Sequence, residues 1–335
     1  MRKKVGFFWV AVVLLCIYGA FWAGASEIDE QLMARARLFP SIGPGLRALR
    51  HGADGRFYVL TSPGTSVAVF DAKGAPLAKV PDYAQNAGPA SADLRAIQFG
   101  EDMDVSTNGT IYVADRGANE VKVWEPNGNA HEFQVMAPTS LAALPDGEVA
   151  VTTLQQTHLV TVYGPNGKVA REFGDPEALS SRQDLNRYVN IGRVASDPQG
   201  HLYYGFTYMP EPLVRQYDRF GYAGQSFEFL GLDAFPEAQA TRKEIQRQET
   251  RDKPPSLHLI LTAFGVDPVN GDVWMCLHNT LVHFDKEGNR RSEYQVYTTK
   301  GARIEASVIL VEEDRLLIGS DPLGVYEFQR PDKKQ

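Results

Sequence analysis

The sequence repeats one short pattern along most of its length. A pair such as Asp54-Gly55 or Asn108-Gly109 is followed by an alternating apolar run, and a second turn of the form Asp-x-x-Gly closes the next run. The first glycines are Gly55, Gly109, Gly147, Gly200 and Gly271, and the second glycine of each copy follows 17 to 21 residues later. Glycine turns between short alternating segments are typical of strands joined by tight hairpins. The chain is therefore expected to be all-β and built from copies of one unit.

Each copy contains four strand-like segments. In the clearest copy they are predicted at residues 102–106, 110–114, 120–124 and 130–135, where apolar and polar residues alternate as in a half-buried strand. There are six copies, and the sixth lacks an outer strand. Ala36-Arg37-Leu38-Phe39, which precedes the first copy and has no partner there, is predicted to supply that strand. The sequence thus predicts a six-bladed β-propeller of four-stranded antiparallel blades, closed by an N-terminal strand so that no large gap is left.

Residues 1–25 differ from the repeats. Arg2-Lys3-Lys4 precedes an uncharged apolar stretch over 5–25, and Ala23-Gly24-Ala25 fits a small-x-small cleavage site. The stretch is also long enough to span a bilayer as an apolar helix, so a cleaved signal peptide and a retained anchor remain alternatives. Both alternatives predict that the propeller, residues 26–335, is exported to the periplasm or the exterior. Membrane contact is then expected only through the N-terminal segment.

Charge and motifs exclude several classes of function. The formal net charge is -7, and the part after residue 25 is more acidic still, which argues against a nucleic-acid partner. The body contains one cysteine, Cys276, in an apolar strand pattern typical of the core. The sequence has no His-x-His or His-Glu-x-x-His metal motif, no Gly-x-Ser-x-Gly elbow and no phosphate-binding loop. The scaffold signal is therefore strong, and a catalytic signal is absent.

The second copy resembles the NHL family of six-bladed propellers. The similarity rests on Asp104 to Asp115, which ends in Ala-Asp, followed by Asn119 and the apolar segment ending at Trp124. It extends across roughly residues 45–330. The resemblance implies the architecture and says little about chemistry, because such folds carry many activities.

Strand parity assigns the connections to two faces. Both glycine turns of every copy fall on one face, and the loops between second and third strands and the links between copies fall on the other. The longest links, at roughly 174–190 and 230–256, are on this second face. Asp175-Pro176 predicts the start of a helix, and a second helix is predicted over 237–249. This second helix is either a solvated helix over the ring or a lid that contacts a partner.

Functional loops tend to cluster at one end of a rigid scaffold, so the ligand site is predicted on the loop-rich face. The candidate ligand-binding residues there are Asp115, Arg116, Asn119, His158, Tyr208, Glu211, His278, Asn279 and Asp321. Asp115 and Asn119 have a structural alternative, because Asp and Asn side chains commonly bond to the backbone of their own loop.

Two functions follow as hypotheses. The first is an exported scaffold that binds a protein, a peptide or a polar small ligand through this face. The alternative is a metal-dependent hydrolase or lyase, because six-bladed propellers that this chain more distantly resembles include gluconolactonases and streptogramin lyases. That resemblance implies a divalent metal such as calcium or zinc at the channel mouth, held by His158, Glu211, His278 and Asp321.

Overall fold

The structure is a computed structural model that describes residues 30–81, 96–154, 157–230, 235–250 and 253–333. The chain divides into a unit of residues 1–30 and a compact unit of residues 31–335. The signal peptide or apolar helix predicted for residues 1–25 lies outside the described residues. None of the helices in the described ranges is long and apolar enough to cross a bilayer.

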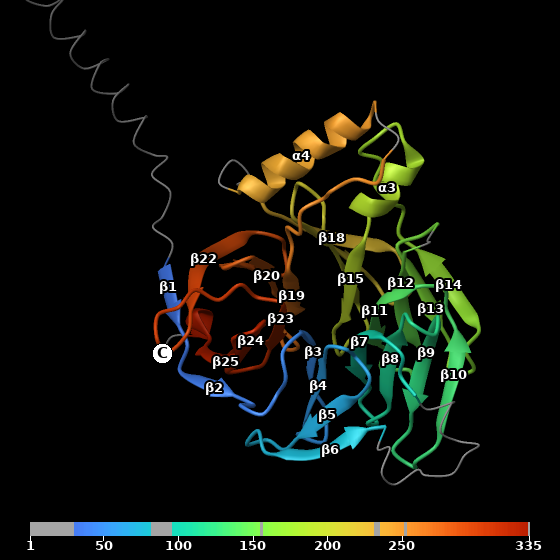
Figure 1. Cartoon of the computed structure of the whole chain (residues 1–335), viewed down its shortest axis with the longest axis vertical. Coiled ribbons are helices and arrows are strands. Elements are labelled where there is room, and N and C mark those ends of the chain that lie inside the picture. The colour runs from blue at the N-terminus through green and yellow to red at the C-terminus, as the bar shows by residue number, and fades with distance from the viewer. Residues whose placement is uncertain (1–29, 82–95, 155–156, 231–234, 251–252, 334–335) are drawn as a thin grey trace, which may run out of the picture. The chain divides into compact units, whose positions relative to one another are not determined.

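Six antiparallel sheets surround a common centre (Figure 1), which confirms the predicted six-bladed propeller. Blade 1 contains β3 (Leu46–His51), β4 (Phe57–Thr61), β5 (Val67–Phe70) and β6 (Pro76–Val80). Blade 2 contains β7 (Gly100–Val105), β8 (Ile111–Asp115), β9 (Glu120–Trp124) and β10 (Ala130–Gln134). Blade 3 contains β11 (Pro138–Ala143), β12 (Val149–Thr153), β13 (Val160–Tyr163) and β14 (Val169–Phe173).

The remaining blades follow the same order. Blade 4 contains β15 (Gly192–Ser196), β16 (Leu202–Phe206), β17 (Leu213–Tyr217) and β18 (Ala223–Glu228). Blade 5 contains β19 (Ala263–Val266), β20 (Val273–Leu277), β21 (Thr280–Phe284) and β22 (Arg290–Tyr297). Blade 6 contains β23 (Val308–Val311), β24 (Arg315–Ser320) and β25 (Gly324–Gln329). The first strand of each blade is innermost and packs against the first strands of its neighbours.

The N-terminal segment completes the ring, as predicted. β2 (Ala36–Leu38) pairs antiparallel with β25 and becomes the fourth strand of blade 6. Phe39, the residue after β2, is buried against Phe57 and Phe70 of blade 1, with ring centroids 5.1 Å from each. β1 (Glu30–Met33) adds a fifth strand beside β22 in blade 5, which the repeat did not predict.

The repeated Asp-x-x-Gly turns have a local physical cause. In blade 1, the carboxylate of Asp71 accepts hydrogen bonds from the backbone N–H groups of Lys73 and Ala75, at 2.9 and 2.8 Å. Gly74 in the same turn has a φ of 83°, a conformation that costs glycine little. Asp218 repeats this pattern in blade 4 with Phe220 and Tyr222. The turn residues are therefore explained by hairpin geometry alone.

Apolar side chains between adjacent blades form the core. Cys276 is buried in one such cluster, and burial raises the pKa of its thiol, so its predicted role as a core residue is confirmed. Trp274 on the same strand is fully buried and stacks on His283, with ring centroids 4.1 Å apart. The blades are therefore held together by side-chain packing, without a disulfide in the described residues.

Both long links contain a helix, but one begins later than expected. α3 covers Gln183–Val189, whereas a helix was predicted to start at Asp175. The segment before α3 is held in an irregular conformation by side-chain bonds from Asn190 to both backbone groups of Glu177. Competition by such side-chain bonds keeps backbone groups out of a helix.

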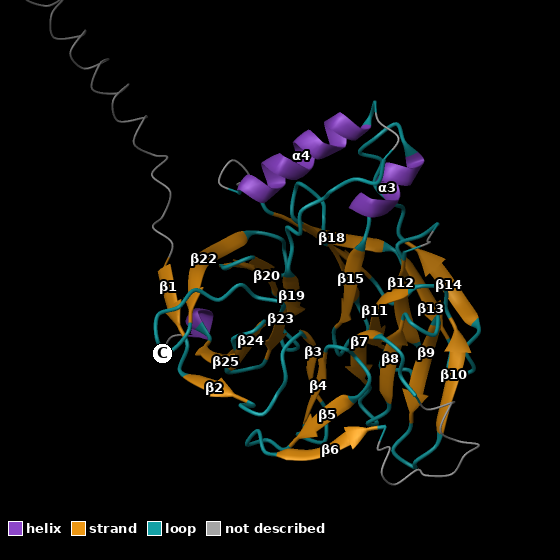
Figure 2. Ribbon diagram, viewed as in Figure 1, coloured by secondary structure: helices purple, strands orange, loops and turns teal. Residues whose placement is uncertain are grey.

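The second predicted helix is confirmed as α4 (Pro236–Gln248). Its Ile245 packs against Leu185 and Val189 of α3, so the two links form one small helical unit. In the view of Figures 1 and 2, this unit lies beyond blade 4 and does not cover the centre of the ring. The helix therefore does not lie over the channel as a lid in this structure.

Candidate functional site

The antiparallel pairing sorts the connections onto two faces, as strand parity predicts. We call the face with the hairpin turns between first and second strands the turn face, and the opposite one the loop face. All nine predicted ligand-binding residues belong to loops of the loop face or to the strand ends beside them. Their hydrogen-bond and ion-pair partners nevertheless differ from one residue to the next.

Asp115 and Asn119 shape their own loop. Asp115 is fully buried, and its carboxylate accepts hydrogen bonds from the backbone N–H groups of Gln98 and Phe99, both at 2.8 Å. Asn119 has a φ of 58°, and its side-chain oxygen accepts from the N–H of Ala137 at 2.9 Å. Both residues therefore have a structural role, because these contacts hold their loop to the links before and after blade 2.

Arg116 contributes to a charged cluster at the loop face. Its Nη1 lies 2.8 Å from Glu101, which also pairs with Arg47 of blade 1. Both guanidinium groups lie over the ring of Phe99, at 5.1 and 4.3 Å from its centroid. Arg116 is therefore partly committed to Glu101 and Phe99.

The other predicted residues bond to separate partners. Arg242 of α4 donates to Glu211 at 3.0 Å, and the backbone carbonyl of Leu259 lies 2.9 Å from Nε2 of His278. Asp321 accepts from the N–H of Gly45 at 2.9 Å. His158 lies beside Thr157, Tyr208 is half-buried, and Asn279 donates to Gln295.

The predicted metal ligands do not come together. Within the described part of the chain, the only group of three or more potential ligands consists of Asp272, His283 and Asp332. His158, Glu211, His278 and Asp321 therefore do not form such a group. As they stand, these residues do not fit a divalent metal at the channel mouth.

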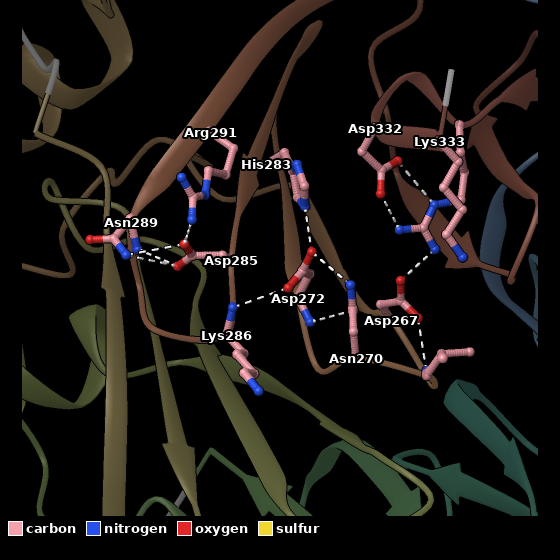
Figure 3. A network of polar contacts seen from close by, with 12 residues as sticks. Asp267, Asn270, Asp272, His283, Asp285, Lys286, Asn289, Arg291, Asp332 and Lys333 are labelled. Atoms are coloured by element: carbon pink, nitrogen blue, oxygen red, sulfur yellow. Dashed lines mark hydrogen bonds and ion pairs between the residues drawn. The ribbon is translucent and has the colours of Figure 1, made fainter. Parts of the chain in front are cut away.

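The group at Asp272 lies in the turn region of blade 5, and its polar atoms already have partners (Figure 3). Oδ2 of Asp272 is 2.9 Å from Nε2 of His283 and accepts a hydrogen bond from Asn270, while Oδ1 accepts from the N–H of Lys286. Asp332 accepts two hydrogen bonds from Arg330. A metal ion would have to displace these donors and sit beside a guanidinium, so the group fits a structural network better.

A cavity of about 680 Å³ lies at the centre of the ring. Its wall includes residues from the inner strand or adjoining turn of every blade. The cavity extends from Asp102 and Arg193, near the starts of their strands, to the hairpin turns that contain Pro145, Pro198 and Pro268. The cavity therefore follows the axis of the propeller toward the turn face, whereas sequence analysis placed the site on the loop face.

A charged cluster on blades 1 and 2 forms one side of this cavity. Arg50 of β3 donates to Asp104 at 3.0 Å and to Asp102 at 3.2 Å, both on β7. Burial raises the pKa of Asp104. The nearby charge of Asp102 adds to this rise, although the charge of Arg50 opposes it. Burial lowers the pKa of Arg50, but the two carboxylates outweigh it, so its pKa is raised and it stays charged.

Polar contacts continue from this cluster to blades 3 and 4. Asp102 accepts a hydrogen bond from the hydroxyl of Ser140 at 2.6 Å, and Asp104 accepts from the N–H of Ala143 at 2.8 Å. Oγ of Ser140 in turn accepts from the N–H of Val194 at 3.2 Å. Four inner strands are thus joined by side chains that satisfy the backbone edge facing the channel.

Arg193 of β15 also lines the cavity, and its surroundings differ from those of Arg50. Its Nη1 lies 3.4 Å from the backbone carbonyl of Ser307, a long contact. Among the residues that the structure describes, no carboxylate forms an ion pair with it. The cavity wall therefore contains three arginines. Arg50 and Arg315 are each held by two carboxylates, whereas Arg193 has no acidic partner among the described residues.

Asp102 and Asp104 were not among the candidate residues predicted from the sequence, although their spacing indicated a buried charged pair. Asp102 and Asp104 are two apart in a segment predicted as an innermost strand, where Met103 alternates with them. Carboxylates inside an inner strand require partners from a neighbouring blade. The partner Arg50 is 52 residues from Asp102 in the chain, so only the fold identifies it.

No family model and no curated protein matches the sequence. Solved structures do match the fold. A streptogramin B lyase has a TM-score of 0.54 at 13% identity, covering 88% of this chain and 86% of that one. A gluconolactonase from Xanthomonas campestris has a TM-score of 0.55 at 15% identity, covering 92% and 96%. The WD40 repeats of RRP9 have a TM-score of 0.55 at 12% identity, covering 89% and 99%. At these identities the similarity shows the fold alone: the chain is a six-bladed β-propeller.

Proposed function

We propose that this chain is an exported binding protein that takes up a small molecule at the centre of its propeller. The observation that carries the proposal is the cavity of about 680 Å³, lined by all six blades. Its volume lies within the roughly 300–1,000 Å³ of known small-molecule pockets. Charged groups on one part of its wall and apolar strands on another suit a ligand with both kinds of surface.

The contacts in the cavity favour binding over hydrolysis. Ser140 is the hydroxyl group closest to a carboxylate there, but it is fully buried and bonded on both sides, to Asp102 and to the N–H of Val194. A nucleophile has to reach the reacting atom of its substrate, and this hydroxyl is not exposed. Two of the structural neighbours are named as enzymes. Their similarity to this chain is one of fold, and it identifies no catalytic residue in this cavity.

A ligand screen followed by a crystal structure tests the proposal. The purified full chain is screened against soluble small molecules by ligand-observed NMR, and the tightest binder is located crystallographically. We expect one molecule per chain, inside the central cavity. A binder located only outside the cavity contradicts the proposal, and conversion of the bound molecule to a product supports the enzymatic alternative.

A second candidate function is partner binding through the loop face. Apolar side chains are exposed on three successive links of that face: Met136, Leu179, Tyr188, Leu230 and Leu259. Leu230 is 83% exposed and Met136 is 58% exposed, although both side chains favour burial. Replacing both with Ser and comparing the proteins captured by each form in an exported fraction tests this role. Identical captured sets would contradict it.

Export itself rests on the N-terminal sequence. The cationic start and the apolar stretch over 5–25 support a signal or an anchor. A fusion of the chain to a reporter that is active only outside the cytoplasm should be active. Removal of residues 2–25 should abolish that activity.

A further inference from the structure

The wall of the central cavity is divided by chemistry. Blades 1 to 4 carry the chain of polar contacts from Arg50 through Asp102 and Ser140 to Val194. Blades 5 and 6 instead present apolar residues of β19 and β23. They include Phe264, Val266, Ile309 and Val311. A bound molecule therefore meets the apolar inner strands of blades 5 and 6 on one side and polar side chains of blades 1 to 4 on the other. The charged residues Glu312 to Arg315 follow β23 at the turn face.

Arg193 lies where these two parts of the wall meet. It is the second residue of β15, and its guanidinium extends to the carbonyl of Ser307, directly before β23. Inner strands begin at the loop face, so this charge lies at the loop-face end of the cavity. The apolar residues of β23 continue from there toward the turn face over about 13 Å, at 3.3 Å per residue.

The carboxylates of Asp102 and Asp104 in the cavity wall already have partners. Asp102 accepts from Arg50, Ser140 and two backbone N–H groups, and Asp104 accepts from Arg50 and Ala143. Within the described ranges, the guanidinium of Arg193 has only the long contact to Ser307. A half-buried guanidinium with few partners is unfavourable, and a carboxylate offers it two parallel, charge-assisted hydrogen bonds.

We propose that the cavity binds a monocarboxylate with an apolar body. The carboxylate pairs with Arg193, and the body lies against Phe264, Ile309 and Val311 toward the turn face. Glu313 and Asp314 are exposed at the turn-face opening and disfavour a second negative group at that end. This ligand class rests on the proposed function, because it assumes that the cavity takes up a small molecule.

Three probes of one shape test the ligand class. 3-Phenylpropanoate, 3-phenylpropanamide and 3-phenylpropylammonium differ only in the charge and hydrogen bonding of the head group. Their binding to the purified full chain is measured by saturation-transfer NMR and calorimetry at neutral pH. We expect the carboxylate to bind at least about tenfold more tightly than the amide, as a charged hydrogen-bonded pair allows, and the ammonium to bind most weakly.

Variants of Arg193 connect this preference to the residue. Arg193→Gln should lower the affinity for 3-phenylpropanoate about tenfold or more and leave that for the amide unchanged, whereas Arg193→Lys should keep part of the preference. Arg219→Gln is the matched control, because Arg219 is exposed at a turn of blade 4, outside the cavity wall, and loses the same charge. Circular dichroism melting of each variant separates loss of binding from loss of folding.

The outcomes separate the ligand class from the proposed function. Equal binding of carboxylate and amide, tighter binding of the ammonium, or an unchanged preference in Arg193→Gln overturns the ligand class while the cavity still binds small molecules. If no probe binds and the broader screen also finds nothing in the cavity, the proposed function fails and the ligand class with it. If Arg193→Gln does not fold, the ligand class is still tested by comparing the three probes on the unmodified chain and on Arg193→Lys.

Discussion

Arg330 forms a fully buried ion pair with Asp267, with Nη1 of the arginine 2.5 Å from Oδ2 of the carboxylate. Arg330 directly follows β25, the last strand of blade 6, whereas Asp267 directly follows β19 of blade 5. The guanidinium also pairs with Asp332 at 2.6 Å and lies over the ring of Trp274. The end of the chain is therefore fixed to the neighbouring blade by a buried charge network.

This network predicts a large effect of removing its cation. Arg330→Met leaves Asp267 as a buried carboxylate without its cation, and such a loss costs about 3–5 kcal/mol of unfolding free energy. Chemical denaturation of the variant measures the change. Arg219→Met, which alters an exposed arginine, should change stability by less than about 0.5 kcal/mol. Equal effects of the two substitutions would show that the buried pair does not stabilise the fold.

Phe39 should be as important for closure of the ring as β2 itself. It is 1% exposed and packs against blades 1 and 6, with a φ of 48° that is uncommon for a bulky residue. Phe39→Ala should cost about 3–5 kcal/mol, because it empties the space between the closing strand and blade 1. The thermal midpoint measures this loss. A decrease no greater than that of Met33→Ala, at an exposed position of β1, would contradict the role in closure.

His51 and Glu312 predict a pH dependence of stability at the junction of blades 1 and 6. Nδ1 of His51 lies 2.5 Å from Oε1 of Glu312, and this contact raises the pKa of His51. Burial raises the pKa of Glu312, but hydrogen bonds from His51 and Arg315 outweigh it and bring the pKa below its ordinary value.

The sign of the effect follows from these two shifts. The contribution of His51 is complete below its unfolded pKa of about 6.5 and is lost as pH rises through the higher folded value. The contribution of Glu312 is present above about 4.5 and is lost as pH falls through its lowered folded value. His51→Gln should therefore remove the decrease in stability that occurs as pH rises above about 6.5. His131→Gln, which makes the same replacement at an exposed histidine of blade 2, is the matched control.

Ser140 should stabilise the polar chain that joins the inner strands. Ser140→Ala removes a donor to Asp102 and an acceptor for the N–H of Val194, both buried. Leaving such groups without partners costs about 1–3 kcal/mol. Denaturant unfolding measures this, with Ser256→Ala at an exposed position as the control. Equal unfolding free energies of the two variants would show that this chain of contacts adds little stability.

Removal of divalent metal should not affect stability or binding. The group formed by Asp272, His283 and Asp332 is already occupied by hydrogen bonds from Asn270, Lys286 and Arg330. Dialysis against a chelator should therefore leave the thermal midpoint and probe binding unchanged. A lower midpoint that calcium or zinc restores would instead support the metal-dependent alternative.

The repeat in the sequence was sufficient to predict the architecture. Glycine turns such as the one at Gly109, with its φ of 86°, are local features whose cause lies within four residues, so the hairpins could be placed. Closure by Ala36 to Leu38 followed from counting strands, because an unpaired edge is unfavourable. The helix predicted at Asp175 was wrong because Asn190, 13 residues beyond Glu177, holds that segment in another conformation.

The candidate site depended on contacts that no local pattern contains. The sequence by itself determined six blades, two faces and a buried Cys276, because periodicity and turn chemistry act over a few residues. Only the tertiary structure placed Arg50 beside Asp102 and Asp104 and left Arg193 without an acidic partner in the part of the chain that is described, because these side chains come from different blades. Ring closure sets the distances between side chains of different blades. It depends on packing between strands that are far apart in the chain.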